Sequence, residues 1–165
     1  TQDPSGTPAS AAATVDQLAD LLAPRFAQVS FYWAPNAASA GMVVPGGSIA
    51  VSTSYPMGGA RASGGAQNEY IEYQIPLAAG TYKFQLMHNT QTDCGIYTLS
   101  VDGVDIGTTI DGYAGSSAYL LSEISGITVT GSGRHAIRLR MASKNASSAA
   151  YRFRAGAMSW TRTGA

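Results

Sequence analysis

Residues 95–104, GIYTLSVDGV, place an alternating segment directly before an Asp-Gly pair. In this segment Tyr97, Leu99 and Val101 alternate with Thr98 and Ser100, which is the period-two pattern of a half-buried β-strand. Asp-Gly is a strong sequence signal for a two-residue hairpin turn. We therefore expect an antiparallel hairpin, with residues 95–101 as its first strand and residues 104–110 as its second.

Similar short segments flank this hairpin on both sides. Further strands are expected at residues 31–33, 49–55, 70–75, 82–88, 124–130, 136–141 and 150–161. The side chains expected to point inward are Tyr82, Phe84, Leu86, Leu99, Val101, Ile127, Val129, Ile137 and Leu139. About nine short strands with turn signals between them predict an all-β fold, an antiparallel β-sandwich of the jelly-roll type, over residues 30–165. The glycine-rich segment 56–65 is expected to be a loop, and it lacks the Lys-Ser/Thr of a phosphate-binding loop.

The N-terminal region has a different pattern. Residues 1–13 are rich in Pro, Ser, Thr and Ala and read as a linker. Thr14 to Gln17 form a capping box that predicts one short helix over 14–23, within a helix and exit segment of 14–29. Its apolar seam needs a partner surface, either the domain itself or the same helix in sister chains. The N-terminus has no basic and apolar regions of a secretory signal, and because the chain begins without Met we expect a fragment or a processed product.

Composition argues against several classes of function. Charged residues are 12% of the chain and the formal net charge is zero, which argues against a basic nucleic-acid-binding protein. The single cysteine, Cys94, excludes an intrachain disulfide and a cysteine-based zinc cluster, and two histidines leave little for a metal site. No apolar run approaches the roughly 18 residues of a membrane span. We expect no metal, no cofactor, no nucleic acid and no membrane insertion.

The charges are unevenly divided along the chain. Residues 1–123 carry three bases and ten acids, and residues 124–165 carry seven bases and no acid. Arg138 and Arg140 alternate with apolar residues, which places them on a solvent-side strand face. One interpretation is a solvated face neutralised by Glu69 and Glu72. The other is a basic face for an anionic partner, or a face that meets the acidic region of another subunit.

The sequence contains no arrangement of residues typical of an active site. No Gly-x-Ser-x-Gly elbow occurs, and the spacing of the aspartates between residues 93 and 111 is not that of a calcium loop. His88 is expected to be a core or rim histidine. We expect a protein that is not an enzyme and has no catalytic residues.

Aromatic residues suggest a binding site instead. Tyr113 and Tyr119 flank a Gly-Ser-Ser segment in a stretch expected to be poor in strands, and such tyrosines can stack on sugar rings. Asp111 and Asn145 would bond sugar hydroxyls, and the polar loop 143–148 is either a ligand loop or a plain hairpin. The alternative is that the tyrosines close the end of the sandwich.

Several segments have a familiar order. Residues 71–82, then 97–103, then 127–129 with 133–139, resemble the carbohydrate-binding-module-like jelly rolls, with their "aGtY", "vDG" and "G-hxIrl" phrases. The resemblance implies the architecture. The modules' usual binding aromatics and calcium acids have no residue-by-residue match here.

The whole layout also resembles the C-terminal domains of tailed-phage fibre and minor tail proteins, which run from a linker such as residues 3–10 through a short helix to a Gly/Ser/Thr-rich β-domain. This resemblance implies a homotrimer on the virion surface, outside the cell, that contacts other virion proteins and a host cell-surface polysaccharide. The expected function is therefore a receptor-binding tip of a tail fibre. The alternatives are a capsid decoration or head-fibre domain without a receptor, and a bacterial carbohydrate-binding module.

Overall fold

The computed structural model describes residues 30–32, 49–52, 59–62 and 66–164. Within them the chain forms β1 (Ser30–Tyr32), β2 (Ile49–Ser52), β3 (Gly59–Ala62), β4 (Tyr70–Leu77), β5 (Gly80–Thr90), β6 (Ile96–Val101), β7 (Val104–Asp111), β8 (Ala118–Val129), β9 (Gly133–Ser143) and β10 (Phe153–Gly164). The expected linker and N-terminal helix lie outside the described residues. Among the described residues, no helix has the length and apolar character needed to cross a membrane.

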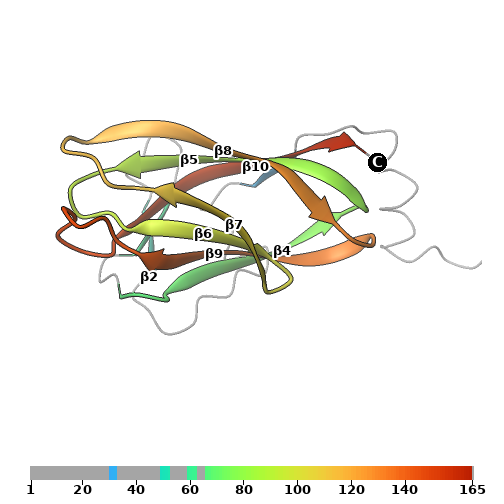
Figure 1. Ribbon diagram of the computed structural model, residues 1–165, viewed down its shortest axis with the longest axis horizontal. Helices are drawn as coiled ribbons and strands as arrows, with labels where there is room; N and C mark the ends of the chain where they lie inside the picture. The colour runs from blue at the N-terminus through green and yellow to red at the C-terminus, as the bar shows by residue number, and fades with distance from the viewer. Residues whose placement is uncertain (1–29, 33–48, 53–58, 63–65, 165) are drawn as a thin grey trace, which may run out of the picture.

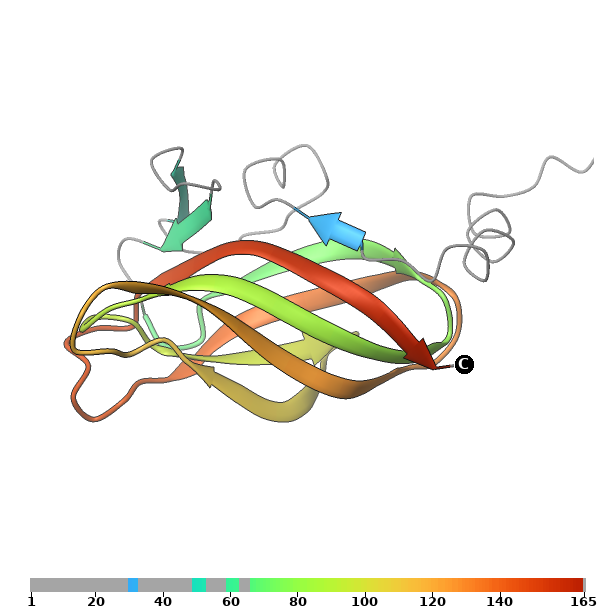
Figure 2. The same cartoon turned by 90° about the horizontal axis from the view of Figure 1, so that it is seen from above.

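The strands form two antiparallel sheets that pack face to face. One sheet has six strands in the order β2-β3-β10-β5-β8, with β1 also paired to β10, and the other has the order β4-β9-β6-β7. Figure 1 shows β8, β5 and β10 in one layer over β7, β6, β9 and β4 in the other. Figure 2 shows β1 and the β2–β3 pair lying along the β10 side of the larger sheet. The predicted all-β antiparallel sandwich is confirmed.

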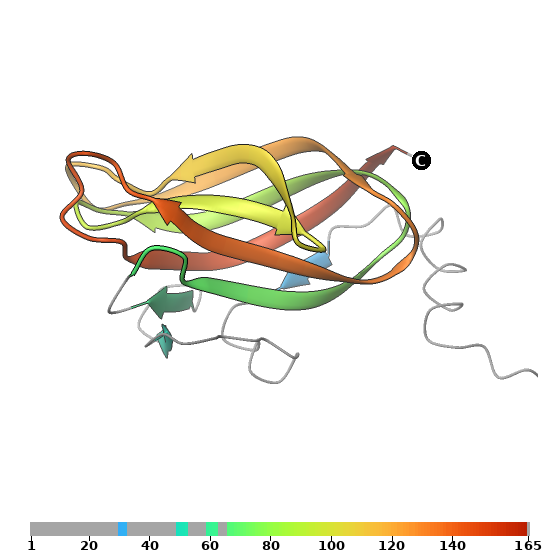
Figure 3. The same ribbon diagram turned by 60° about the horizontal axis from the view of Figure 1, so that its bottom comes forward.

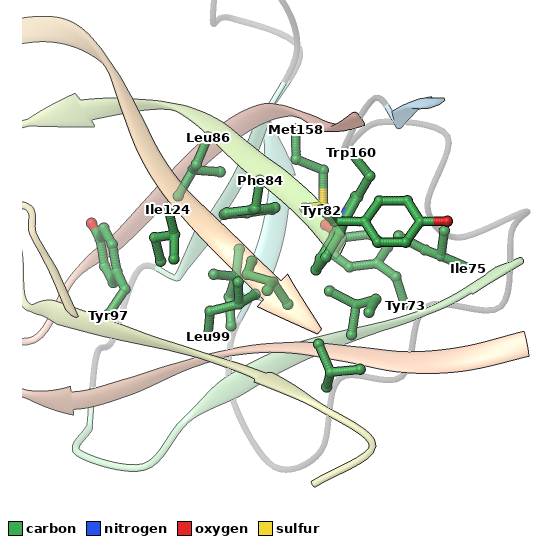
Figure 4. Packing of buried hydrophobic residues seen from close by; sticks show 14 of the residues in the cluster. Tyr73, Ile75, Tyr82, Phe84, Leu86, Tyr97, Leu99, Ile124, Met158 and Trp160 are labelled. Carbon is green, nitrogen blue, oxygen red and sulfur yellow. The ribbon is translucent and has the colours of Figure 1, made fainter. Parts of the chain in front are cut away.

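The hydrophobic core follows from the period-two pattern. All nine side chains predicted to point inward are buried, and the exposed fraction of each is 7% or less. Trp160 lies at the centre of an aromatic group, with its ring 6.1 Å from that of Tyr82 and 5.2 Å from that of Phe84. Figure 4 shows these three rings packed beside Met158 between the sheets. Burial of this apolar surface is the main force that holds the two layers together.

The predicted hairpin is present, and its turn has the geometry that Asp-Gly favours. Asp102 and Gly103 both have positive φ, 50° and 82°, as the two central residues of a type I′ turn require. Asp102 also holds the start of β9, because its carboxylate accepts the Ala136 amide at 2.8 Å and lies 2.7 Å from Nδ1 of His135. The turn is therefore fixed by its backbone and by a carboxylate bridge.

The observed strands differ from the prediction most in two places. β8 begins at Ala118 rather than near residue 124, because β5 continues to Thr90 and pairs with it along its whole length. The first residues of β8 are exposed on both faces, so they lack the alternation that would have identified a strand. The segment expected to be a glycine-rich loop, 56–65, contains β3, which pairs with β2 and β10.

Candidate functional site

Three loops meet at one end of the sandwich, where β5, β7 and β9 end and β6, β8 and β10 begin. They are residues 91–95, 112–117 and 144–152, and we call them the loop rim. Figure 3 shows them together at the end opposite the C-terminus. Antiparallel pairing produces this arrangement, because alternate connections of an antiparallel sandwich lie at the same end.

Backbone hydrogen bonds link the three loops to one another. The first and second loops are joined by Gln91 N to Gly112 O at 3.1 Å and by Gly112 N to Gly95 O at 3.0 Å. The first and third are joined by Ala149 N to Thr92 O at 2.9 Å and by Arg152 N to Asp93 O at 2.9 Å. Each loop is thus held by another, which gives the rim a fixed shape in advance of any ligand.

The rim brings three of the four predicted site residues together. Oδ1 of Asp111 accepts the amide of Tyr113 at 2.8 Å, the Asx-turn geometry typical of aspartate. Its Oδ2 accepts Nδ2 of Asn145 at 2.9 Å, and Oδ1 of Asn145 accepts the amide of Ser147 at 3.0 Å. Asp111 is exposed, and Tyr113 and Asn145 are half-buried. The cluster therefore offers polar atoms to solvent from the end of β7 and from the loop 144–152.

Tyr119, the fourth predicted residue, has a different setting. It lies within β8, opposite Asn89 of β5, and not on a loop. Its exposed fraction is 52%, so it does not close the end of the sandwich. The hydrogen bonds that join Asp111, Tyr113 and Asn145 do not include Tyr119.

The third loop adds residues that the sequence did not single out. Nζ of Lys144 donates to the carbonyl of Ser148 at 3.1 Å and lies 5.4 Å from the centroid of the Tyr151 ring. The Ser148 hydroxyl is buried and donates to the carbonyl of Cys94 at 2.8 Å. A cation beside a half-buried ring places charge and apolar surface next to each other on the rim. In the sequence this loop was marked only by its polarity, with no spacing that singled out these residues.

The base of the rim holds a compact charge cluster. Oδ2 of Asp93 lies 3.0 Å from Nη1 of Arg152 and 3.3 Å from Nη2 of Arg154. Cys94 lies next to this cluster and is buried, and burial raises the pKa of its thiol. A thiol in this state is a poor nucleophile, because the thiolate is the reactive form. These groups therefore stabilise the rim, and Cys94 adds no reactive thiol to it.

Arginines on the outer face of the four-stranded sheet form ion pairs with acidic residues. Nη2 of Arg138 lies 2.7 Å from Oε2 of Glu72, and the guanidinium stacks over the Tyr70 ring at 4.0 Å. Arg140 pairs with Asp105 of β7 at 2.8 Å, so Asp105 rather than Glu69 is its acidic partner. The basic C-terminal region thus meets acids of its own chain. The solvated-face interpretation is confirmed for Arg138 and Arg140, and they do not form an open basic surface.

The Asp102–His135 pair at the opposite end of the molecule has one feature of a catalytic triad, a carboxylate beside an imidazole. Burial alone would raise the pKa of Asp102, but hydrogen bonds from His135 and from the Ala136 amide outweigh it and hold the pKa below its ordinary value. Nε2 of His135 is buried and has no hydrogen-bond partner. A general base needs its free nitrogen beside the proton that it removes, and this one faces the interior. The pair therefore stabilises the β6–β7 hairpin by joining its turn to β9.

Comparison with known proteins identifies the fold. No family model and no curated protein matches the chain. Among solved structures, it is similar to the CBM36-1 domain of a multidomain xylanase from the hindgut metagenome of Trinervitermes trinervoides, with a TM-score of 0.63 and 18% identity over 84% of this chain and 100% of that one. It is also similar to a family 36 carbohydrate-binding module in complex with calcium and xylotriose, with a TM-score of 0.59 and 16% identity over 80% of this chain and 99% of that one.

A third similar structure is a Paenibacillus xanthan lyase, with a TM-score of 0.59 and 22% identity over 74% of this chain. The chain corresponds to only 12% of that enzyme. These identities establish a shared fold: the chain has a carbohydrate-binding-module-like β-sandwich. Nothing in these comparisons indicates a phage protein.

The calcium of the family 36 complex raises the question of whether the rim could hold the same ion. Calcium takes six to eight oxygen ligands, mostly carboxylates and carbonyls. Here the Asp93 carboxylate is already neutralised by two arginines. In the part of the chain that the structure describes, no group of three or more His, Cys, Asp or Glu side chains could hold a metal ion. The rim residues therefore do not fit calcium.

Proposed function

We propose that this chain is a non-catalytic carbohydrate-binding module whose ligand binds on the loop rim. The observation that supports this most is the hydrogen-bonded Asp111–Asn145 pair beside Tyr113, held on a rim whose loops are fixed by one another. A carboxylate and an amide in fixed positions offer the acceptors and donors that sugar hydroxyls need, and a tyrosine ring offers an apolar face.

The architecture supports the same proposal. The order β3-β10-β5-β8 opposite β4-β9-β6-β7 is consistent with a jelly roll, a fold that many lectin domains use. Two of the similar structures are carbohydrate-binding modules, one of which holds xylotriose, and the third is a xanthan lyase. Xylan and xanthan are therefore the first polysaccharides to test.

We propose an extracellular location as part of this function, because the polysaccharides to be tested are found outside cells. A receptor-binding tip on a virion surface is a narrower form of the same proposal, since it adds a phage context and a homotrimer to glycan binding. The bacterial module is the form that the similar structures favour, because they include modules of polysaccharide-degrading enzymes.

The proposal is tested by titrating the full chain with xylan, xanthan and a wider glycan panel in a calorimeter. Asn145→Ala and Tyr113→Ala are each expected to weaken binding tenfold or more, about 1.4 kcal/mol. Tyr113→Phe keeps the ring and is expected to bind like the wild type. Val104→Ala is the matched control, because Val104 is 68% exposed and lies at the opposite end of the sandwich.

Two results would refute the proposal. One is the absence of binding to every glycan of the panel. The other is wild-type affinity in both alanine variants while a glycan still binds, which would place the ligand elsewhere. Incubation of the bound polysaccharide with the protein is expected to release no shorter products, and release of oligosaccharides would overturn the non-catalytic part of the proposal.

A further inference from the structure

The first four residues of β8 form an apolar strip at the edge of the larger sheet. Tyr119, Leu120 and Leu121 are 52%, 48% and 57% exposed, and Ala118 is exposed beside them; we call these four residues the β8 strip. β8 ends the strand order of its sheet, with β5 on one side of it (Figure 1). An edge strand leaves half of its backbone N–H and C=O groups unpaired, so it can accept another strand.

Both faces of the strip are apolar. Tyr119 and Leu121 lie on the outer face of the sheet, on the side of Asn89 and Met87, which are their partners in β5. Leu120 lies on the opposite face, where its partner is the buried His88. Side chains on both faces of one strand cannot be covered by a single layer laid over the sheet. A strand added alongside β8 would contact both sets.

Charge and proline, two usual protections of an edge strand, are missing from the sequence of this strip. Edge strands are normally guarded by lysine, proline or inward-pointing charges. Residues 112–122, GYAGSSAYLLS, contain no charge and no proline. The first charge is Glu123, which is engaged by Gln85 at 3.0 Å and by Lys83 at 3.5 Å. Within the part of the chain that the structure describes, β8 is thus an edge strand whose first residues carry neither charge nor proline.

We propose that the β8 strip is a contact between two copies of this chain, which pair their β8 strands antiparallel about a twofold axis at Leu120. This pairing brings Leu120 opposite Leu120 of the other copy on the inner face. On the outer face it brings Tyr119 of each copy opposite Leu121 of the other, and directly opposed side chains on one face of a sheet contact each other. An uncharged strip meets its own copy without like-charge contact, and a net charge of zero adds no long-range repulsion between copies.

The exposed area sets the strength of this contact. With about 200 Å² for each large side chain, the exposed fractions give roughly 300 Å² of apolar area for one copy and roughly 600 Å² for the pair. Stable interfaces bury about 1,200–2,000 Å². The dimer is therefore weak and depends on protein concentration, with monomer predominating at micromolar protein. A sugar is a poorer occupant, because two adjacent leucines offer it no hydrogen bonds.

Sedimentation of the full chain between about 10 and 500 μM tests the proposal. The wild type is expected to move from 17.0 kDa toward twice that mass as concentration rises. Leu120→Lys places two ammonium groups face to face at the twofold axis, and it is expected to remain monomeric throughout. Val104→Lys, at a residue 68% exposed on β7, is the matched control and is expected to behave like the wild type.

Cysteine crosslinking tests the register of the pairing without depending on the lysine variant. Leu120→Cys is expected to give a disulfide-linked dimer on mild oxidation, whereas Thr128→Cys, exposed on the same strand, is not. The native Cys94 is buried and gives no background. A wild type that is monomeric at every concentration, an oligomer whose mass is unchanged in Leu120→Lys, or equal crosslinking at both positions would overturn the proposal. The pairing does not rest on the glycan proposal, and Leu120→Lys is expected to keep glycan binding.

Discussion

Leu139→Ala tests the core of the sandwich at a fully buried position of a central strand. Leu139 is fully buried in β9, between Ile71 of β4 and Leu99 of β6 in the smaller sheet. The substitution removes three carbons, which is about 2.4 kcal/mol of transfer free energy at roughly 0.8 kcal/mol each. Both neighbouring strands are held by their own hydrogen bonds, so the site collapses little and a cavity term adds to this.

We therefore expect Leu139→Ala to lower the free energy of unfolding by about 3–4 kcal/mol, within the roughly 2–5 kcal/mol range of such substitutions. At about 2–4 °C per kcal/mol for a domain of this size, the Tm falls by roughly 6–16 °C. Urea unfolding and calorimetry measure both quantities. Val104→Ala, at a residue 68% exposed, is the control and should stay within about 0.5 kcal/mol of the wild type. A loss below about 1 kcal/mol for Leu139→Ala would show that this position is not packed as described.

Two further predictions concern the rim and a buried histidine. Gly112→Ala would bring a Cβ to 2.6 Å from Oη of Tyr97, so we expect a lower Tm and weaker glycan binding. Gly115→Ala is the control, because a Cβ there meets no atom within 4 Å. It should change neither quantity in the same thermal and calorimetric assays. Burial lowers the pKa of His88. As the pH decreases below the ordinary histidine value of about 6.5, the unfolded state therefore binds a proton more readily than the folded state. The free energy of unfolding decreases over this range until the pH is below the pKa of the folded state. The slope of stability against pH between about 6.5 and 5 should therefore be smaller in His88→Gln than in the wild type, and an unchanged slope in urea unfolding across that range would contradict this assignment.

Some of the residues on the loop rim could be predicted from the sequence, and others could not. Asp111, Tyr113 and Asn145 were selected by residue type and by their place near strand ends, and hydrogen bonds between the end of β7 and two loops bring them together. Lys144 and Tyr151 were not selected, because a cation and a ring seven residues apart in an irregular loop have no periodicity to reveal their approach. Tyr119 was assigned to a loop because its stretch lacked alternation, and its partner in β5 placed it in a strand instead.

The sequence by itself determined the class of fold. A strand with one buried face shows alternating apolar and polar residues in its own sequence, and an Asp-Gly pair favours a hairpin turn through its own backbone preference. Both are short-range properties. Only the tertiary structure decided which strands are neighbours, which acid meets which arginine and which strand is left at an edge. Arg140 pairs with Asp105 because β9 and β7 flank β6, and the β8 strip lies at an edge because no strand of the described chain follows β8 in the sheet order. Such features depend on residues far apart in sequence, and they exist only once the strands have paired into sheets.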